Sequence, residues 1–197
     1  MNKETNEASP IGQYRPNLSM YHANGKGTGC AVKMSLHPAH DNVDGCIMVT
    51  MANQMTVGNR NGPNVTFPTF DWDNAICVKL GFTDLSKMLQ VFRGECESLE
   101  DGKGLLHRSP KGLTNIKFHH MIEPISGYSL EVYRTHNVTD KEDAHARIIF
   151  NAAEAGGICE AIAGSMYVIG FGIPMLVPHS TAAYKAEAGR MCNEHAA

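Results

Sequence analysis

The chain has 197 residues, of which 43% are hydrophobic and 19% charged, and its formal net charge at pH 7 is −3. This apolar content is enough for one domain, or two closely packed halves, with a hydrophobic core. No segment approaches the roughly 18 consecutive apolar residues of a membrane helix. A strongly basic composition, which would point to nucleic acid, is absent, so any such function must depend on local patches.

The first 10 residues are polar and acidic and contain no apolar stretch of the kind found in a secretory signal. We interpret residues 1–20 as a disordered N-terminal tail and expect a cytoplasmic, intracellular protein with no membrane partner. The six cysteines form no C-x-x-C pair, and several fall inside apolar patterns. We therefore expect buried thiols rather than disulfides or a zinc module.

The first part of the chain predicts a hairpin and then a strand joined to a helix. Apolar and polar residues alternate at 31–36 and again at 46–55, on either side of a turn at 41–45. Residues 76–82 alternate in the same way, and the period then changes to that of a helix over 84–93.

That helix has recognisable end signals in the sequence. Thr83 is a candidate N-cap, and Asp84 suits the first turn of a helix. Gly94 is a suitable stop.

The second part repeats this plan. Strands are predicted at residues 105–109, 113–123, 128–134 and 146–150. In the second of them, alternation directs His120 and Ile122 to the core and His119 to the surface. Asn151 and Glu154 form a capping-box-like start for a helix over residues 152–167. Pro174 would end any continuation of this helix.

Runs of strands that are each followed by one helix favour an antiparallel α+β architecture over parallel βαβ winding. The last residues, 179–197, form a C-terminal extension in which 182–191 could make a loose helix.

Two motifs offer chemistry, each with a plainer alternative. The glycine-rich stretch 24–29 lacks the Gly-Lys-Ser/Thr ending of a P-loop and leads into a strand. It is either a flexible entry loop or a loop that brings Lys26 and its backbone to a phosphate chain. His37, His40 and Asp41 could bind a metal ion, but their spacing places no further ligand.

No nucleophile motif is present, so the sequence does not favour catalysis, and we expect no cofactor and no metal. The outward strand positions and nearby loops are more informative, because they interleave cations with aromatic rings. Cations track phosphates and aromatic faces stack bases, at about 1–3 kcal/mol per base. The alternative is an ordinary solvated face, with Trp72 packed against the core. The residues concerned are Lys26, Lys33, Arg60, Phe67, Phe70, Trp72, Lys79, Lys117, His119 and Tyr133.

The order of motifs resembles the Whirly family of single-stranded DNA-binding proteins, which has the Whirly/PUR-alpha-like fold. Gly25-Lys-Gly-Thr-Gly-Cys-Ala31 before a strand, and Phe70-Asp-Trp72 before a strand and a helix, are similar to passages of that family. Phe150-Asn-Ala-Ala-Glu154 before the last helix continues the order. The chain departs from the family in having one lysine and extra glycines in its entry motif, and in a longer loop at 58–68.

The resemblance implies a single Whirly-like domain over residues 21–178. It would contain two roughly perpendicular four-stranded antiparallel sheets, each followed by a helix. It also implies a homotetramer assembled through the helices, with single strands held across sheet edges between neighbouring subunits. The small residues Ala161, Gly164 and Ser165 are compatible with such close helix packing.

We therefore predict a non-enzymatic protein that binds single-stranded DNA with little sequence preference, in replication, repair or transcription. One alternative is an RNA-binding protein with the same fold. Another is a metal-dependent enzyme that uses His37, His40 and Asp41, and a third is a scaffold whose aromatic loop binds another protein.

Overall fold

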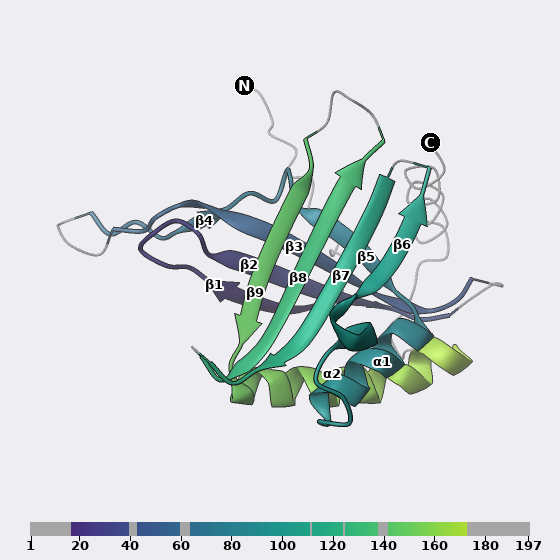
Figure 1. The fold of residues 1–197 in the computed structure, drawn as a ribbon. Helices are drawn as coiled ribbons and strands as arrows, with labels where there is room; N and C mark the ends of the chain where they lie inside the picture. The colour runs from purple at the N-terminus through teal and green to yellow at the C-terminus, as the bar shows by residue number, and fades with distance from the viewer. Residues whose placement is uncertain are drawn as a thin grey trace, which may run out of the picture.

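The computed structural model describes residues 17–39, 43–59, 64–110, 112–123, 125–137 and 142–172. They form two antiparallel sheets, each followed in the chain by a helix (Figure 1). The predicted α+β class and the order strands, helix, strands, helix are confirmed. Within these residues, no helix combines the length and the apolar character needed to cross a membrane.

The first sheet has the strand order β1-β2-β3-β5, and β4 pairs with the far end of β3. Its strands are β1 (Asn17–His22), β2 (Cys30–His37), β3 (Cys46–Thr56), β4 (Thr69–Phe70) and β5 (Ile76–Leu80). The predicted hairpin over 31–55 is confirmed as β2 and β3, which pair from Cys30↔Asn53 to His37↔Cys46. One side of each strand packs in the core, as the period of two requires, but Ala31, Met48 and Ala52 on the other side are buried as well.

The strand β1 begins at Asn17, inside the segment 1–20 that we expected to be disordered. It pairs with β2 over its whole length, from Asn17↔Ser35 to His22↔Cys30. Backbone pairing to the edge of β2 orders a segment whose own pattern is too short and too polar to predict a strand. The expectation was therefore wrong for residues 17–20, and residues 1–16 lie outside the described part.

The second sheet is a meander in which each strand pairs with the next. It consists of β6 (Leu105–Ser109), β7 (Gly112–Met121), β8 (Gly127–His136) and β9 (Ala144–Phe150), so all four predicted strands are confirmed. Alternation places Ile116 and Phe118 in the core, but His120 and Ile122 are exposed, the latter at 78%. The prediction for these two was wrong because His120, near the end of β7, and Ile122, just after it, lie past the edge of the core, where strand alternation no longer determines burial.

The helix α1 (Phe82–Phe92) starts two residues earlier than predicted. Its N-cap is Gly81 rather than Thr83, and the Asp84 carboxylate accepts the Gly81 N–H at 3.1 Å. Asp84 therefore stabilises the first turn by satisfying a free backbone donor. Gly94 follows the helix with a φ of 73°, as expected of a stop residue.

The helix α2 (Ala152–Phe171) has the predicted capping box between Asn151 and Glu154. It continues past residue 167 and ends at Gly172, which adopts a left-handed φ of 61°. Pro174 and the proposed extension 179–197 lie outside the described residues.

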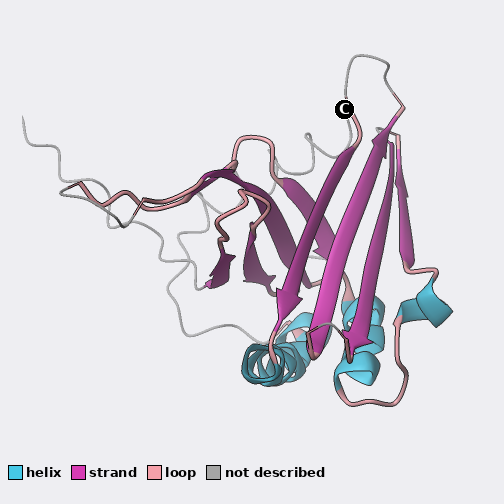
Figure 2. Cartoon of the chain, turned by 60° about the vertical axis from the view of Figure 1, so that its left-hand side comes forward, coloured by secondary structure: helices cyan, strands magenta, loops and turns pink. Residues whose placement is uncertain are grey.

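One hydrophobic core lies between the inner faces of the two sheets and is covered along one side by both helices, which lie next to each other (Figures 1 and 2). The strands of the two sheets cross rather than run parallel, and β9 passes over β2, β3 and β5. Arg134 of β8 joins the sheets, because its guanidinium donates to the Cys77 carbonyl at 2.5 Å and to the Thr114 hydroxyl at 3.1 Å. Burial lowers the pKa of Arg134, in keeping with this structural position.

Candidate nucleic-acid interface

The outer face of the first sheet carries a lysine surrounded by aromatic rings. The Lys33 ammonium lies 4.1 Å from the centre of the Trp72 ring, a cation–π contact. The Tyr21 ring centre is 5.7 Å from that of Phe70 and 6.4 Å from that of Trp72. These four residues, here called the sheet-1 cluster, come from β1, β2, β4 and the link between β4 and β5, so the fold assembles them from distant parts of the chain.

Lys79 lies on the same outer face but outside this cluster. Its cross-strand partner is Met48, two residues before Thr50, which pairs with Lys33. Lys79 is exposed, whereas its partner Met48 and Ala52, on the far side of Thr50, are buried. The face is therefore only partly open, and its accessible part is centred on the aromatic rings.

The outer face of the second sheet carries a stack of three side chains. The Tyr133 and His145 rings are nearly parallel, with centres 4.2 Å apart and planes 13° apart. The Lys117 ammonium lies 5.7 Å from the Tyr133 ring centre. Lys117, Tyr133 and His145, here called the sheet-2 stack, come from three adjacent strands, and the exposed His145 ring ends the stack.

A carboxylate lies beside this stack and holds it in place. Glu131 accepts the Tyr133 hydroxyl at 2.6 Å, and its other oxygen is 3.1 Å from Arg147 Nε. The Ser129 hydroxyl also donates to it, at 3.3 Å. Burial tends to raise the pKa of Glu131, but the hydrogen bond from Tyr133 and the charge of Arg147 outweigh it and leave that pKa below its usual value. The hydrogen bond to Glu131 in turn raises the pKa of Tyr133.

The glycine-rich loop is ordered by side chains rather than open. The Asn24 side-chain oxygen accepts the backbone N–H groups of Lys26 and Thr28 at 3.0 and 3.1 Å. Gln54 of β3 accepts the N–H groups of Asn24 and Gly29. Four of the loop amides that could have faced a phosphate are therefore used internally, and Lys26 is left as an exposed side chain on a fixed loop.

The two sheets are joined where β3 crosses the start of β9. The Asn53 side-chain amide donates to the His145 carbonyl at 2.8 Å, and the Asn53 carbonyl accepts the Asp71 N–H at 2.9 Å. Asp71 lies between Phe70 and Trp72, while Gln54 follows Asn53 and holds the Lys26 loop. This junction thus links the sheet-1 cluster, the sheet-2 stack and the Lys26 loop within a few residues.

The remaining predicted site residues lie apart from these groups. Phe67 precedes β4 and is 75% exposed. His119 lies on the outer face of β7, in the next row of the sheet from Lys117, and is half-buried. Arg60, and the His40 and Asp41 of the metal alternative, lie outside the described residues.

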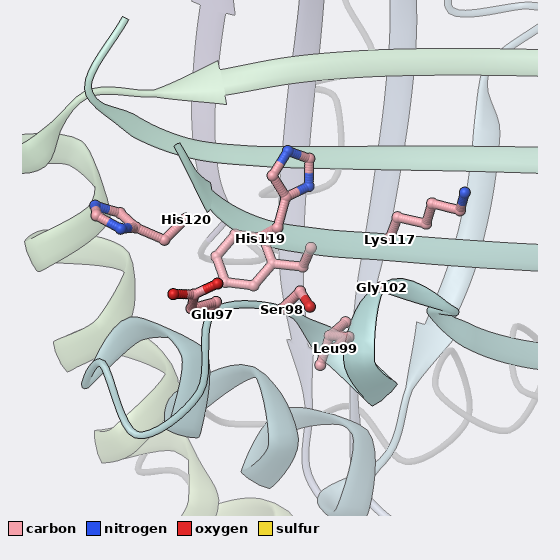
Figure 3. A pocket seen from close by; sticks show the side chains of 8 residues that line it. Glu97, Ser98, Leu99, Gly102, Lys117, His119 and His120 are labelled. Carbon is pink, nitrogen blue, oxygen red and sulfur yellow. The ribbon is translucent and has the colours of Figure 1, made fainter. Parts of the chain in front are cut away.

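Among the described residues, no group of three or more His, Cys, Asp or Glu side chains could hold a metal ion. A pocket of about 250 Å³ lies between β7 and the short helical segment η1 (Leu99–Gly102). Figure 3 shows that its polar side chains diverge: Lys117, His119 and His120 point in different directions. They do not converge on a common point, so the pocket does not resemble a catalytic site.

Sequence reasoning missed four side chains of these groups: Tyr21, Glu131, His145 and Arg147. The last two could have been found, since burial of Ala146 and Ile148 directs both outward by alternation. Tyr21 was not considered because the strand that carries it, β1, begins within the segment interpreted as a disordered tail.

No protein-family model matches the chain, and no curated protein matches it. Solved structures do. The chain is similar to the crystal structure of WHY3 from Arabidopsis thaliana, with 16% identity over 93% of this chain and 99% of that chain and a TM-score of 0.62. It is also similar to WHY1 from Arabidopsis thaliana, with 14% identity over 90% of this chain and 94% of that chain and a TM-score of 0.58.

A further similarity is to the crystal structures of MRP1/MRP2 from Trypanosoma bruciei, with 15% identity over 79% of this chain and 86% of that chain and a TM-score of 0.53. At these identities the similarity shows the fold alone. The fold of the chain is therefore Whirly-like, as its motif order indicated.

Proposed function

We propose that this protein binds single-stranded DNA with little sequence preference, through the sheet-1 cluster, the sheet-2 stack and the Lys26 loop, and that it is not an enzyme. The observation that carries the proposal is the junction at Asn53. Asn53 hydrogen-bonds to the His145 carbonyl in the sheet-2 stack and to the Asp71 N–H in the sheet-1 cluster's β4–β5 link, so a single strand could pass from one sheet to the other near this residue.

The chemistry of both groups suits an unpaired strand. Lys33 and Lys117 each lie beside an aromatic ring, so a phosphate and a neighbouring base could be contacted at one place. Stacking on aromatic faces tolerates every base, which accounts for weak sequence preference. In a duplex the bases are already stacked and paired, so the aromatic rings would gain little.

The proposal includes a homotetramer assembled through the helices. The helix α2 carries apolar residues on every side and only two charged residues, Glu154 and Glu160, and its Tyr167 and Phe171 are more than half exposed, as is Phe82 at the start of α1. A helix that is apolar all round is normally buried, which supports self-association. Ala161 and Gly164 are exposed on α2 and would allow another helix to approach closely.

We also place the protein in the cytoplasm, in replication, repair or transcription. Of the six cysteines, the five within the described residues, at positions 30, 46, 77, 96 and 159, are free thiols, which favours a reducing compartment. Cell fractionation would test this location.

The proposal is tested by fluorescence anisotropy with a labelled single-stranded oligonucleotide and the matched duplex. We expect tight binding to the single strand, weaker binding to the duplex, and an affinity that falls with salt as counterions are released. No binding to single-stranded DNA or RNA at low salt would overturn the proposal. Competition between DNA and RNA of the same sequence would distinguish the RNA-binding alternative, and light scattering would give the number of subunits.

A further inference from the structure

The proposed function uses only Phe70, at the base, of the two-stranded arm that continues from β3 and leads back into β4. The arm consists of residues 54–59 and 64–70. Figures 1 and 2 both show it extending away from the sheets and helices. From Gln54 to Asn59 it rises roughly 17 Å at about 3.3 Å per residue, the length of about five stacked nucleotides at about 3.4 Å each.

Hydrogen bonds between its strands hold the arm in one shape. The Thr56 and Thr69 hydroxyls are 2.8 Å apart, and Thr69 N–H donates to the Thr56 hydroxyl at 3.0 Å. Further out, Asn59 N–H donates to the Thr66 hydroxyl and Thr66 N–H to the Asn59 carbonyl, both at 2.9 Å. The strands also approach closely at Gly58, where an added Cβ would lie 2.7 Å from Pro68 Cδ. The arm is therefore ordered before any partner arrives.

The arm exposes large apolar side chains from both strands. Met55 is 62% exposed, Val57 50%, Val65 55% and Phe67 75%. No carboxylate opposes an anionic partner, because the sequence contains neither Asp nor Glu between Asp44 and Asp71. An extended surface of this kind normally marks a contact site.

The position of the arm indicates which partner it contacts. It begins one residue after Asn53, the residue that joins the sheet-1 cluster to the sheet-2 stack. Gln54 at its base also fixes the Lys26 loop, and a Cβ on Gly27 of that loop would be 3.6 Å from Val57. On its returning strand, Phe67 leads to Phe70, which contacts Tyr21. The arm thus extends the proposed binding surface outward.

We propose that the arm is a second contact surface for the bound single strand, on which Phe67 stacks a base and Met55 and Val65 pack against neighbouring bases. This inference rests on the proposed function. Apolar side chains of this kind are known to insert between bases, and the faces of bases are the apolar part of a single strand. Since the described part of the arm carries no charge, it would add affinity without adding phosphate contacts.

The test compares an arm variant, Met55→Ser with Val65→Ser and Phe67→Ser, with a control variant, Ile122→Ser with Ile125→Ser. All five side chains are more than half exposed, and the control pair lies in the β7–β8 connection, away from the junction. Anisotropy titrations with single-stranded DNA would be run over a series of salt concentrations, and light scattering would give the mass of each protein.

We expect the arm variant to bind about tenfold or more weakly, in line with the loss of one stacked base. The slope of log K against log salt should be unchanged, because no phosphate contact is lost. The control variant should bind like the wild type. Equal affinity of the arm variant and the wild type would overturn the arm proposal while leaving the proposed function intact.

Two other outcomes are also decisive. If the arm variant has a lower mass than the wild type, the arm is an interface between copies of the chain, and the proposal is wrong. If the wild type itself binds no single-stranded DNA or RNA, the proposed function is wrong, and the arm proposal, which depends on it, is wrong as well.

Discussion

The sheet-1 cluster and the sheet-2 stack contain the same kinds of side chain but differ in what surrounds the cation. Within the described residues, no ion pair joins Lys33 to a carboxylate, and its nearest described partner is the Trp72 ring. In the second sheet, Glu131 lies directly across the strands from Lys117 and binds Tyr133 and Arg147. The two surfaces therefore differ in charge and rigidity. The first offers a lysine and an accessible ring, while the second is a hydrogen-bonded network whose charges partly cancel.

The largest effect on binding is expected at Trp72. Replacing Trp72 by Ala removes the broad ring of the sheet-1 cluster and the cation–π partner of Lys33. We expect the affinity for single-stranded DNA to fall about 10- to 100-fold, because loss of a stacked base costs about 1–3 kcal/mol. Anisotropy titration measures this, and Trp72→Phe, which keeps a ring, should lose much less. Unchanged affinity of the Ala variant would show that the ring only packs against the sheet.

Disrupting the Glu131 network of the second sheet should mainly lower the stability of the protein. Glu131→Gln keeps the shape but removes the charge that accepts from Tyr133 and pairs with Arg147. At pH 7 we expect the free energy of unfolding to fall by about 1.5–3 kcal/mol, the range for a hydrogen bond to a charged group. Urea unfolding followed by circular dichroism measures it.

The pH dependence of this effect has a definite sign. The pKa of Glu131 is lower in the folded protein than the ordinary value of about 4.3. Its stabilisation is therefore complete above the unfolded-state pKa and is lost as pH falls through the folded-state pKa. The stability difference between the wild type and Glu131→Gln should shrink as the pH is lowered from 6 towards about 3. A difference that stays constant over this range would show that the carboxylate charge is not what stabilises the network.

The two lysines should differ in their salt dependence. Each phosphate contact to a single strand contributes about 0.7 to the slope of log K against log salt. Lys33→Gln should lower that slope by about this amount. Lys117→Gln should lower it less, because Glu131 already offsets part of the charge of Lys117. Exposed Lys103, which lies after η1, gives a control substitution. Equal changes for Lys33 and Lys117 would remove the distinction between the two surfaces.

The sequence predicted most of the fold because its strands are half-buried. Alternation located β2, β3 and the four strands of the second sheet, and the change of period located both helices. It failed where tertiary contacts decide the structure. β1 is ordered by pairing with β2, α1 is capped by Asp84 through Gly81, and Ile122 lies beyond the core although its period points inward.

The candidate site was predictable as a set of residues but not as two groups. Alternation identifies Lys33, Lys117 and Tyr133 as outward, and composition draws attention to Trp72. Neither can tell that Tyr21 meets Phe70 or that His145 stacks on Tyr133, since these contacts depend on strand order and register. The Asn53 junction depends on how the two sheets cross, which no local pattern contains.

The smallest effect, and the finest test of the comparison, is expected at His145. Tyr133 has the His145 ring on one side and the Lys117 ammonium nearby, so a base would meet the exposed His145 ring first. His145→Ala removes that terminal ring but leaves the Glu131 network intact, because its Nε2 is 3.8 Å from the carboxylate, too far for a strong bond.

We therefore expect His145→Ala to lower the affinity for single-stranded DNA about three- to fivefold, below the full value of a stacked base, with stability nearly unchanged. His145→Phe should restore the affinity, because an apolar ring can still stack on Tyr133. If His145→Phe binds as weakly as His145→Ala, a polar or charged contact of the imidazole matters instead. The sheet-2 stack would then contact phosphates rather than bases, and the contrast drawn between the two sheets would be wrong.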